Sequence, residues 1–215
     1  MAIGFALVLL FLLGNALVSF QNMRRVIYNN AEVTRSHQVL AEMQAVLSTM
    51  QDAETGQRGY IITGQEKYLE PYTAATAHIG ERLQQLRVLV VMPSVKQYLP
   101  TLKHQVEERL ASLRETIAVR RSAGVDEARG RILSGHGKQE MDAVRATIAE
   151  MEGAENTLLV QRAAQSRASA QNALLTLAIS SLVSLALLLL VWFIIGRDAA
   201  HRLIAAAQLK ASSDR

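Results

Sequence analysis

The sequence predicts an all-α protein, built as an antiparallel four-helix bundle flanked by two transmembrane helices. Two blocks near the ends of the 215-residue chain are apolar and uncharged. Between them, apolar residues recur every three or four positions, the pattern of helices packed side by side. Proline and aromatic residues are scarce, at three residues and 5%, which is typical of helical chains. The expected segments are a first span (1–20), a bundle (21–172), a second span (173–196) and a tail helix (197–215).

Both apolar blocks are long enough to cross a bilayer. Neither contains Asp, Glu, Lys or Arg, and about 20 apolar residues cross the hydrocarbon core. Trp192 and Phe193 suit the membrane interface, and Arg197 ends the second block. A cleaved signal peptide is the alternative for the first block, although it lacks a basic start and a clear cleavage motif. Arginines follow both blocks, so the positive charges do not decide the orientation.

Four amphipathic segments follow one another between the spans. Short connections between them predict helices that alternate in direction. The first and last segments continue into the spans without a helix breaker. A short helical piece (126–133) and a loop (134–138) are expected before the last segment. The apolar rows are Val26, Val33, Leu40, Met43, Leu47 and Met50; Leu69, Tyr72, Thr76, Ile79, Leu83, Leu86 and Val90; Leu99, Leu102, Val106, Leu110, Leu113 and Ile117, ending near Gly124; and Met141, Val144, Ile148, Met151 and Leu158.

Polar residues occupy positions where these rows predict apolar ones. Glu54 and Gln57 extend the first row, in a stretch that also holds Gly56 and Gly59, each costing about 1 kcal/mol relative to alanine in a helix. Buried charge requires a partner. We interpret the set as a core cluster that fixes the register of the bundle, with sensing of a small ligand as a compatible alternative. The candidate residues are Asp52, Glu54, Thr55, Gln57, Arg58, Tyr60, Tyr72, Glu155 and Arg162.

The heights of these residues above the membrane restrict their pairing. Glu54 precedes Arg58 by four residues, the favourable spacing for a helical ion pair. At a rise of ~1.5 Å per residue, Glu54 and Glu155 differ in height by roughly 20 Å. We therefore do not expect Glu155 to contact Arg58. The partners nearer in height are Arg114 or Arg120 on the third helix, or residues near Met141.

The segment Asp52-Ala-Glu-Thr-Gly-Gln-Arg-Gly-Tyr-Ile-Ile-Thr-Gly64, followed by Tyr68-Leu-Glu-Pro-Tyr72, resembles the signature of the type 3 CHASE sensor domain. Ser134-Gly-His-Gly-Lys138 and Glu155-Asn-Thr-Leu-Leu-Val-Gln-Arg162 are similar to later segments of the same family. The resemblance extends over about residues 24–172. It implies an extracytoplasmic input domain in the bacterial inner membrane, with both termini in the cytoplasm. Related proteins feed histidine kinases, diguanylate cyclases or chemoreceptor-like outputs.

The residues after Gly196 depart from that pattern. The stretch from Arg197 to Arg215 is too short for an output domain, and His201 lacks the neighbours of a phosphoacceptor histidine. We expect either a truncated chain or a stand-alone sensor. The alternative function is a structural or adaptor protein that binds partner membrane proteins through its spans.

The sequence predicts neither an enzyme nor a cofactor or metal site. Cysteine is absent, the histidines are scattered, and no glycine loop has phosphate-binding spacing. The net charge of +4 comes from interleaved acidic and basic residues, which argues against nucleic acid as a partner. The expected partners are the membrane, an unknown small ligand or protein stimulus, and a second copy of the chain. Ser180 and Ser184 have the spacing that lets membrane helices approach closely, although ordinary tolerated serines are the alternative.

Overall fold

The computed structural model describes the backbone of residues 2–213 and the side chains of residues 9–193 and 196–197. The predicted all-α class is confirmed, because every element in that backbone is helical. The chain divides into two compact units, Ala31–Ala163 and Met1–Asn30 with Ala164–Arg215. The elements are α1 (Ala2–Thr63), the 3-10 helix η1 (Glu66–Leu69), α2 (Glu70–Leu89), α3 (Pro93–Lys96), α4 (Leu99–Ala123), α5 (Val125–Leu133) and α6 (His136–Ser213).

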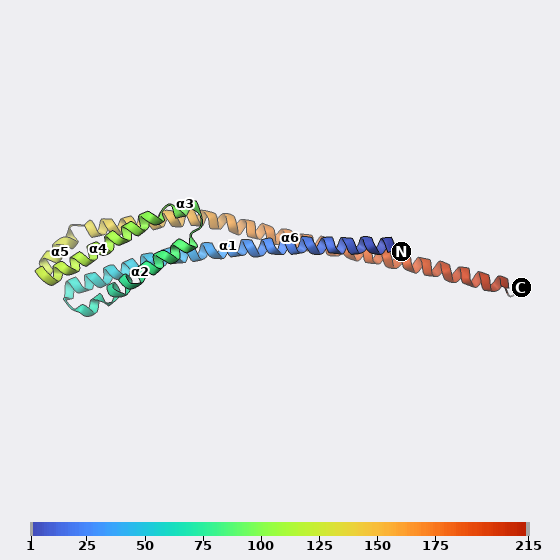
Figure 1. The fold of residues 1–215 in the computed structure, drawn as a ribbon, viewed down its shortest axis with the longest axis horizontal. Helices are drawn as coiled ribbons and strands as arrows, with labels where there is room; N and C mark the ends of the chain where they lie inside the picture. The colour runs from blue at the N-terminus through green and yellow to red at the C-terminus, as the bar shows by residue number, and fades with distance from the viewer. Residues whose placement is uncertain (1, 214–215) are drawn as a thin grey trace. The chain divides into compact units, whose positions relative to one another are not determined.

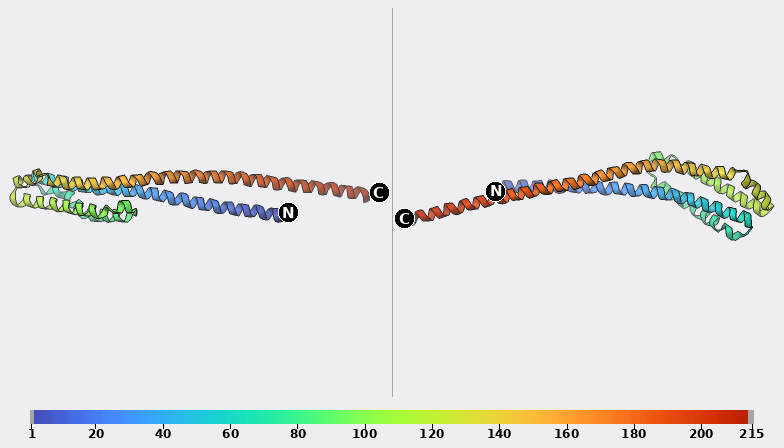
Figure 2. Two further views of the ribbon diagram at one scale, coloured as in Figure 1. Left: turned by 90° about the horizontal axis from the view of Figure 1, so that it is seen from above. Right: turned by 180° about the vertical axis from the view of Figure 1, so that it is seen from behind.

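In the unit Ala31–Ala163, the long helices α1, α2, α4 and α6 lie side by side and reverse direction at each connection (Figures 1 and 2). Each contributes apolar side chains to one shared core. These side chains stand three, four or seven residues apart, so each helix presents one stripe to its neighbours. The core residues are Val39, Met43, Val46 and Met50 from α1, Ile79 and Leu86 from α2, Leu102 and Val106 from α4, and Met141, Val144, Ile148 and Met151 from α6.

The predicted row of the first helix is wrong by one position in part of its length. Val39 and Val46 are buried, whereas the predicted Leu40 and Leu47 are only partly buried and pack against the edge of the core. The reason is that a helix in such a core buries a stripe wider than one row. The central row and its flank are therefore both apolar.

Three glycines with positive φ mark the ends of helices. Gly64 (φ 71°) follows α1, Gly124 (φ 94°) follows α4, and Gly135 (φ 77°) precedes α6. Glycine adopts this left-handed conformation without steric cost. The predicted end near Gly124 and the short helix after it are thus observed. The predicted loop (134–138) is shorter than expected, because α6 already begins at His136.

The two glycines inside α1 have a packing role. A Cβ atom at Gly56 would lie 2.9 Å from the backbone nitrogen of Tyr72, and one at Gly59 would lie 3.1 Å from the ring of Tyr68. Both contacts are too close for a side chain to fit without a shift. The start of α2 can therefore rest directly on α1 only because these positions lack a side chain.

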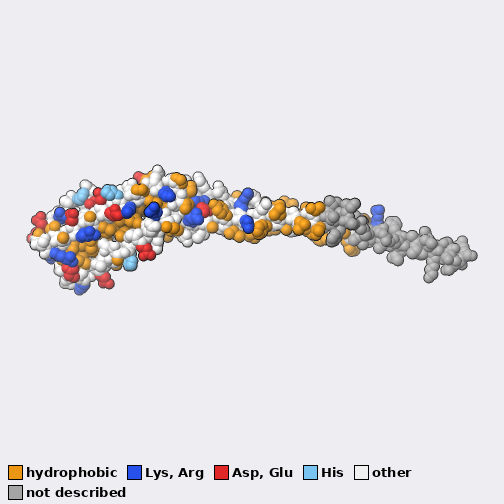
Figure 3. Space-filling view, in the orientation of Figure 1, with side chains coloured by type: hydrophobic (Ala, Val, Ile, Leu, Met, Phe, Trp, Pro, Cys, Tyr) orange, Lys and Arg blue, Asp and Glu red, His pale blue; other side chains and the backbone are white. Residues whose placement is uncertain are grey.

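The second unit consists of the outer parts of α1 and α6. Hydrogen bonds join them: among the described residues, Asn29 Nδ2 donates to Ser169 Oγ (3.0 Å), and Ser166 Oγ donates to Asn30 Oδ1 (2.7 Å). Large apolar side chains cover its surface, including Leu10, Leu174 and Trp192, each at least 66% exposed. Figure 3 shows this surface in orange.

Among the described residues, one helix is long and apolar enough to cross a membrane. It is the portion of α6 between His136 and Phe193, which holds a window of mean hydropathy 2.6 with none of it buried. The predicted first span (1–20) is not identified by this criterion, and the side chains of its residues 1–8 lie outside those described. The side chains of the predicted tail from residue 198 onward also lie outside the described residues.

Candidate functional site

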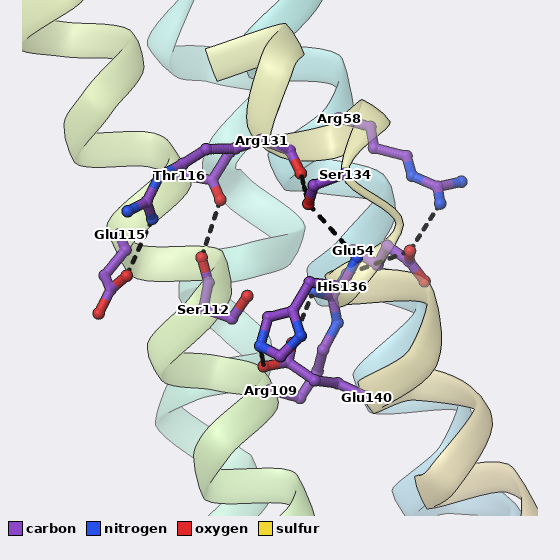
Figure 4. A network of polar contacts seen from close by, with 10 residues as sticks. All are labelled: Glu54, Arg58, Arg109, Ser112, Glu115, Thr116, Arg131, Ser134, His136 and Glu140. Carbon is purple, nitrogen blue, oxygen red and sulfur yellow. Dashed lines mark hydrogen bonds and ion pairs between the residues drawn. The ribbon is translucent and has the colours of Figure 1, made fainter. Parts of the chain in front are cut away.

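A buried arginine of α4 links three helices at the candidate site (Figure 4). The Arg109 side chain is 7% exposed. Its Nη2 donates to Oε1 of Glu54 on α1 (3.2 Å), and its Nη1 donates to Oε2 of Glu140 on α6 (3.3 Å). Both carboxylates are also largely buried, at 9% and 14% exposed. One guanidinium thus fixes the distances among α1, α4 and α6 through charge-assisted hydrogen bonds.

Two further groups extend this network toward solvent. Arg58 donates through Nη2 to the same Oε1 of Glu54 (2.7 Å), so the predicted helical ion pair is present. His136, the first residue of α6, places Nε2 at 3.1 Å from Oε1 of Glu140. Arg58 and His136 are 57% and 71% exposed. The network therefore has a buried centre at Arg109 and two solvent-exposed ends at Arg58 and His136.

Local sequence positions explain how Arg109 reaches this place. It lies three residues after Val106 and four before Leu113, on the buried row of α4. Opposite it, α6 carries Gly137, where a Cβ atom would collide with Nη1 of Arg109. The glycine leaves room for the guanidinium against the first turn of α6.

The network forms one wall of a cleft of about 630 Å³. Residues of α1, α4, α5 and α6 line it, and both signs of charge are present. Across the α4 and α5 part of the lining, Arg131 Nη1 donates to Oε2 of Glu115 (2.9 Å). The buried Gln57 also lines the cleft, as do Ser112 and Thr116. Such a lining can bind a polar or charged small molecule through hydrogen bonds.

A second polar cluster joins α1 and α6 elsewhere in the same unit. Arg162 Nη1 donates to Ser36 Oγ (2.5 Å) and to Glu155 Oε1 (3.2 Å), and Nη2 lies 3.1 Å from Glu32 Oε2. Ser36 and Glu155 are buried. The structure thus brings Glu155 and Arg162 together and gives neither a contact with Arg58, in line with the height argument.

The remaining predicted residues fall outside both clusters. Asp52 and Thr55 are exposed. Tyr60 is buried in a small core with Ile61 and Leu69, and Tyr72 packs against that core. The predicted set therefore separates into an Arg109 group, an Arg162 group, a packing group of Tyr60 and Tyr72, and the exposed Asp52 and Thr55.

Sequence reasoning missed Arg109, Glu140 and Ser36. Residues near Met141 were expected as partners, and Glu140 is its direct neighbour. Of the two arginines expected on the third helix, Arg120 instead donates Nε to the carbonyl oxygen of Ile61 (2.9 Å). A row through Leu102 and Val106 continues to Arg109 three residues on and to Leu110 four residues on, so the spacing alone did not select the arginine.

Two exposed carboxylates outside the lining of this cleft have a lowered pKa. Arg121, which hydrogen-bonds Glu66 at 2.8 and 3.2 Å, lowers the pKa of that carboxyl below its ordinary value of 4.5. The same contact raises the pKa of Arg121. Hydrogen bonds from Lys138 and Arg145 lower the pKa of Asp142. In each case a bonded cation stabilises the charged carboxylate.

No group of three or more His, Asp or Glu side chains within the described part of the chain has the arrangement of a metal site. The side chains that line the cleft offer charge pairing and hydrogen bonding. Its distinctive feature is that one buried cation, Arg109, connects the helices that surround the cleft.

Comparison with known proteins places these observations in context. A family model described as the CHASE3 domain matches residues 29–165. The crystal structure of the sensor domain of histidine kinase HK9 from Rhodopseudomonas palustris is similar in fold, with 24% sequence identity and a TM-score of 0.53. That likeness covers 58% of this chain and 98% of the other. No curated protein sequence matches the chain significantly.

Proposed function

This chain belongs to the CHASE3 domain family, the sensor input modules of signal-transducing receptors, and on that basis we propose that it is the extracytoplasmic input module of a bacterial inner-membrane receptor. The proposed output is a histidine kinase or a related receptor enzyme in the cytoplasm. The likeness in fold to the sensor domain of a histidine kinase supports a histidine kinase as the output.

The proposed architecture is an antiparallel four-helix bundle (21–172) between two membrane spans (1–20 and 173–196), with a cytoplasmic linker helix (197–215). The shared core of α1, α2, α4 and α6 supports the bundle. The exposed apolar surface of α6 supports the second span, because such a stretch is unfavourable in water and favourable in lipid. The uncharged sequence of residues 1–20 supports the first span.

The observation that carries the proposal is the continuity of α6. This helix (His136–Ser213) contributes Glu140 to the buried network, and it also contains the apolar stretch. A stimulus that alters the contacts of Arg109 changes how the start of α6 is held by α1 and α4. The described part of α6 contains no proline and no glycine with positive φ. A displacement of the start of the helix is therefore transmitted along its axis. We also propose that two copies of the chain act as a homodimer.

The orientation can be tested with reporter fusions in a bacterial host. Alkaline phosphatase is active only outside the cytoplasm, so its fusion after Lys103 should be active. A fluorescent protein fused after Arg215 should fluoresce, because that end lies in the cytoplasm. Phosphatase fused after Arg215 is the matched control and should be inactive. An inactive fusion after Lys103 beside an active one after Arg215 would reverse the proposed orientation.

A further inference from the structure

The Arg109 cleft contains a hydrogen-bond donor that the protein leaves unused. The Arg109 side chain is more than nine-tenths buried and lines the cleft. Its two terminal nitrogens are bonded to Glu54 and Glu140, but its Nε has no partner. A buried donor without an acceptor is unfavourable. Because Arg109 lines the cleft, a ligand acceptor would remove that cost once it reached Nε, which the protein encloses in the empty cleft.

The start of α6 adds a second, independent feature to the same cleft. The first turn of a helix exposes unbonded N–H groups and a partial positive charge. The first turn of α6 carries no acidic residue, and it places His136 and Lys138 in the lining of the cleft. Lys138 adds positive charge at this end of the helix, which favours a nearby anion. Gly137, between His136 and Lys138, lets the Arg109 guanidinium pack directly against this turn, so the buried donor and the helix N-terminus lie at the same end of the cleft.

Two exposed cations of the lining are held by pairs that a ligand can replace. Arg131 is bonded to Glu115, and Lys138 is bonded to Asp142. All four of these side chains are at least 43% exposed. Water screens such pairs strongly, so exchanging the partner of either cation costs little.

We propose that this cleft binds a small ligand through one oxyanion group, a carboxylate or a phosphate. The group is seated at the first turn of α6, between the helix N–H groups and the side chains of Arg131 and Lys138. Arg109 supplies the buried donor. This inference rests on the proposed receptor function in one respect, namely that the ligand is the stimulus of that receptor. Binding of the ligand does not depend on the orientation of the chain in the membrane.

The acidic side chains of the lining restrict the ligand further. Glu54 and Glu140 are already engaged by Arg109. Glu108 and Glu127 also line the cleft, and they would repel additional negative charge. The ligand therefore carries its negative charge at one end. A positively charged or hydrogen-bond-donating group elsewhere on the ligand would be favourable.

The test is probe binding to the full chain in detergent micelles. Acetate and inorganic phosphate serve as separate probes of the two oxyanion classes, at an ionic strength held constant with sodium chloride, because salt screens exposed charges. Either probe should raise the melting temperature in a saturable manner. In Arg131→Gln and Lys138→Gln, the apparent Kd should rise by about tenfold or more, as expected for a lost charge-assisted hydrogen bond.

The matched controls are Arg121→Gln and Lys103→Gln. Each removes a cation from an equally exposed ion pair, with Glu66 and with Glu107, outside the Arg109 cleft. Both controls should bind the probes as the unmodified chain does. Saturable stabilisation by neither probe, or equal weakening in the controls, would overturn the proposed site. Active phosphatase fusions in the same variants would show that the receptor topology stands independently of that result.

Discussion

Arg109 and Glu54 form an ion pair of 3.2 Å between α4 and α1, and both side chains are more than nine-tenths buried. Arg58 binds the same carboxylate oxygen of Glu54 at the shorter distance of 2.7 Å, but its own side chain is 57% exposed. The two arginines thus share one acceptor in very different surroundings. Burial rather than distance determines what each pair contributes, since the removal of one partner leaves a charge without compensation only where water is excluded.

The first prediction compares these two arginines through their common partner. Glu54→Ala should lower the free energy of unfolding by about 3 kcal/mol, because Arg109 stays buried with one carboxylate lost. Arg58→Ala should lower the free energy of unfolding by less than about 1 kcal/mol, because the Arg58 side chain is exposed and water screens its pair with Glu54. Urea denaturation of the full chain in micelles, followed by circular dichroism, measures both. Similar losses in the two variants would show that Arg109 gains water when Glu54 is removed.

The sequence located Glu54 but not Arg109, and the physical reason lies in the width of a buried stripe. Extending the first row by three and four residues leads directly to Glu54 and Gln57, and both are buried. On the third helix, the row drawn through Leu110 passes beside Arg109. Two adjacent rows are apolar there, so periodicity alone does not choose between them. The partner becomes visible only when α4 and α6 are placed side by side.

The glycines of α1 show the same limit of prediction from the sequence pattern. The sequence shows that these glycines weaken the helix. It does not show why glycine is needed there, which is that η1 and the start of α2 pack directly against them. Helix periodicity predicts which residues face inward, but it does not predict how closely two backbones approach. The all-α class, the helix end at Gly124 and the row of α6 were accessible from the sequence, because each depends on local pattern.

The second prediction uses glycines to test that close approach. Gly56→Ala should destabilise the chain by about 1–3 kcal/mol, because a methyl group there meets the backbone of Tyr68 and Tyr72 at 3.0 and 2.9 Å. Gly153→Ala is the matched control on α6. Its added Cβ meets nothing within 4 Å, so alanine should stabilise the helix by about 1 kcal/mol. The same denaturation assay reports the opposite signs, and stabilisation by both changes would contradict the close packing of α2 on α1.

The third prediction concerns Glu66 and its hydrogen bond from Arg121. Because the pKa of Glu66 is lowered in the folded chain, the pair stabilises the fold above pH 4.5, and this contribution is lost as the pH falls through the lowered value. In Arg121→Gln the pKa of Glu66 should rise toward 4.5, as measured by carbon-13 NMR of the carboxyl group. The variant should be less stable than the unmodified chain at neutral pH and equal to it in acid. Arg114→Gln is the control and should leave the pKa of Glu66 unchanged.

The fourth prediction tests the pairing of α1 with α6 in the unit that contains their outer parts. Asn29 and Ser169 are hydrogen-bonded through their side chains at 3.0 Å, so cysteines at both positions should form a disulfide within one chain on mild oxidation. The chain has no other cysteine, so the gel shift on reduction reports this bond alone. Tyr28→Cys with Ser169→Cys is the control, because Tyr28 is 66% exposed. Equal crosslinking of both pairs would mean that α1 rotates freely against α6.

The last prediction addresses the proposed homodimer through the second span. Ser180 and Ser184, the residues whose spacing suggested a contact between copies, are only half-buried within one chain. They belong to a set of half-buried positions on one face of α6, namely Ala173, Thr176, Ser180, Ser184, Leu187 and Val191. Since α1 and α6 of the same chain form this unit, we expect that face to be the one turned toward α1. A dimer contact through α6 must then use the opposite, exposed face.

Single cysteines placed from Leu177 to Val191 distinguish the two faces. Oxidative crosslinking between copies in membranes should peak at exposed positions such as Leu182 and Leu189, with a period of about 3.6 residues. It should be weakest at Ser180 and Ser184. A maximum at these serines would mean that α6 leaves α1 to pair with a second copy. An absence of crosslinks along the whole span would remove α6 as a dimer contact, and the signal would then have to pass through a single chain.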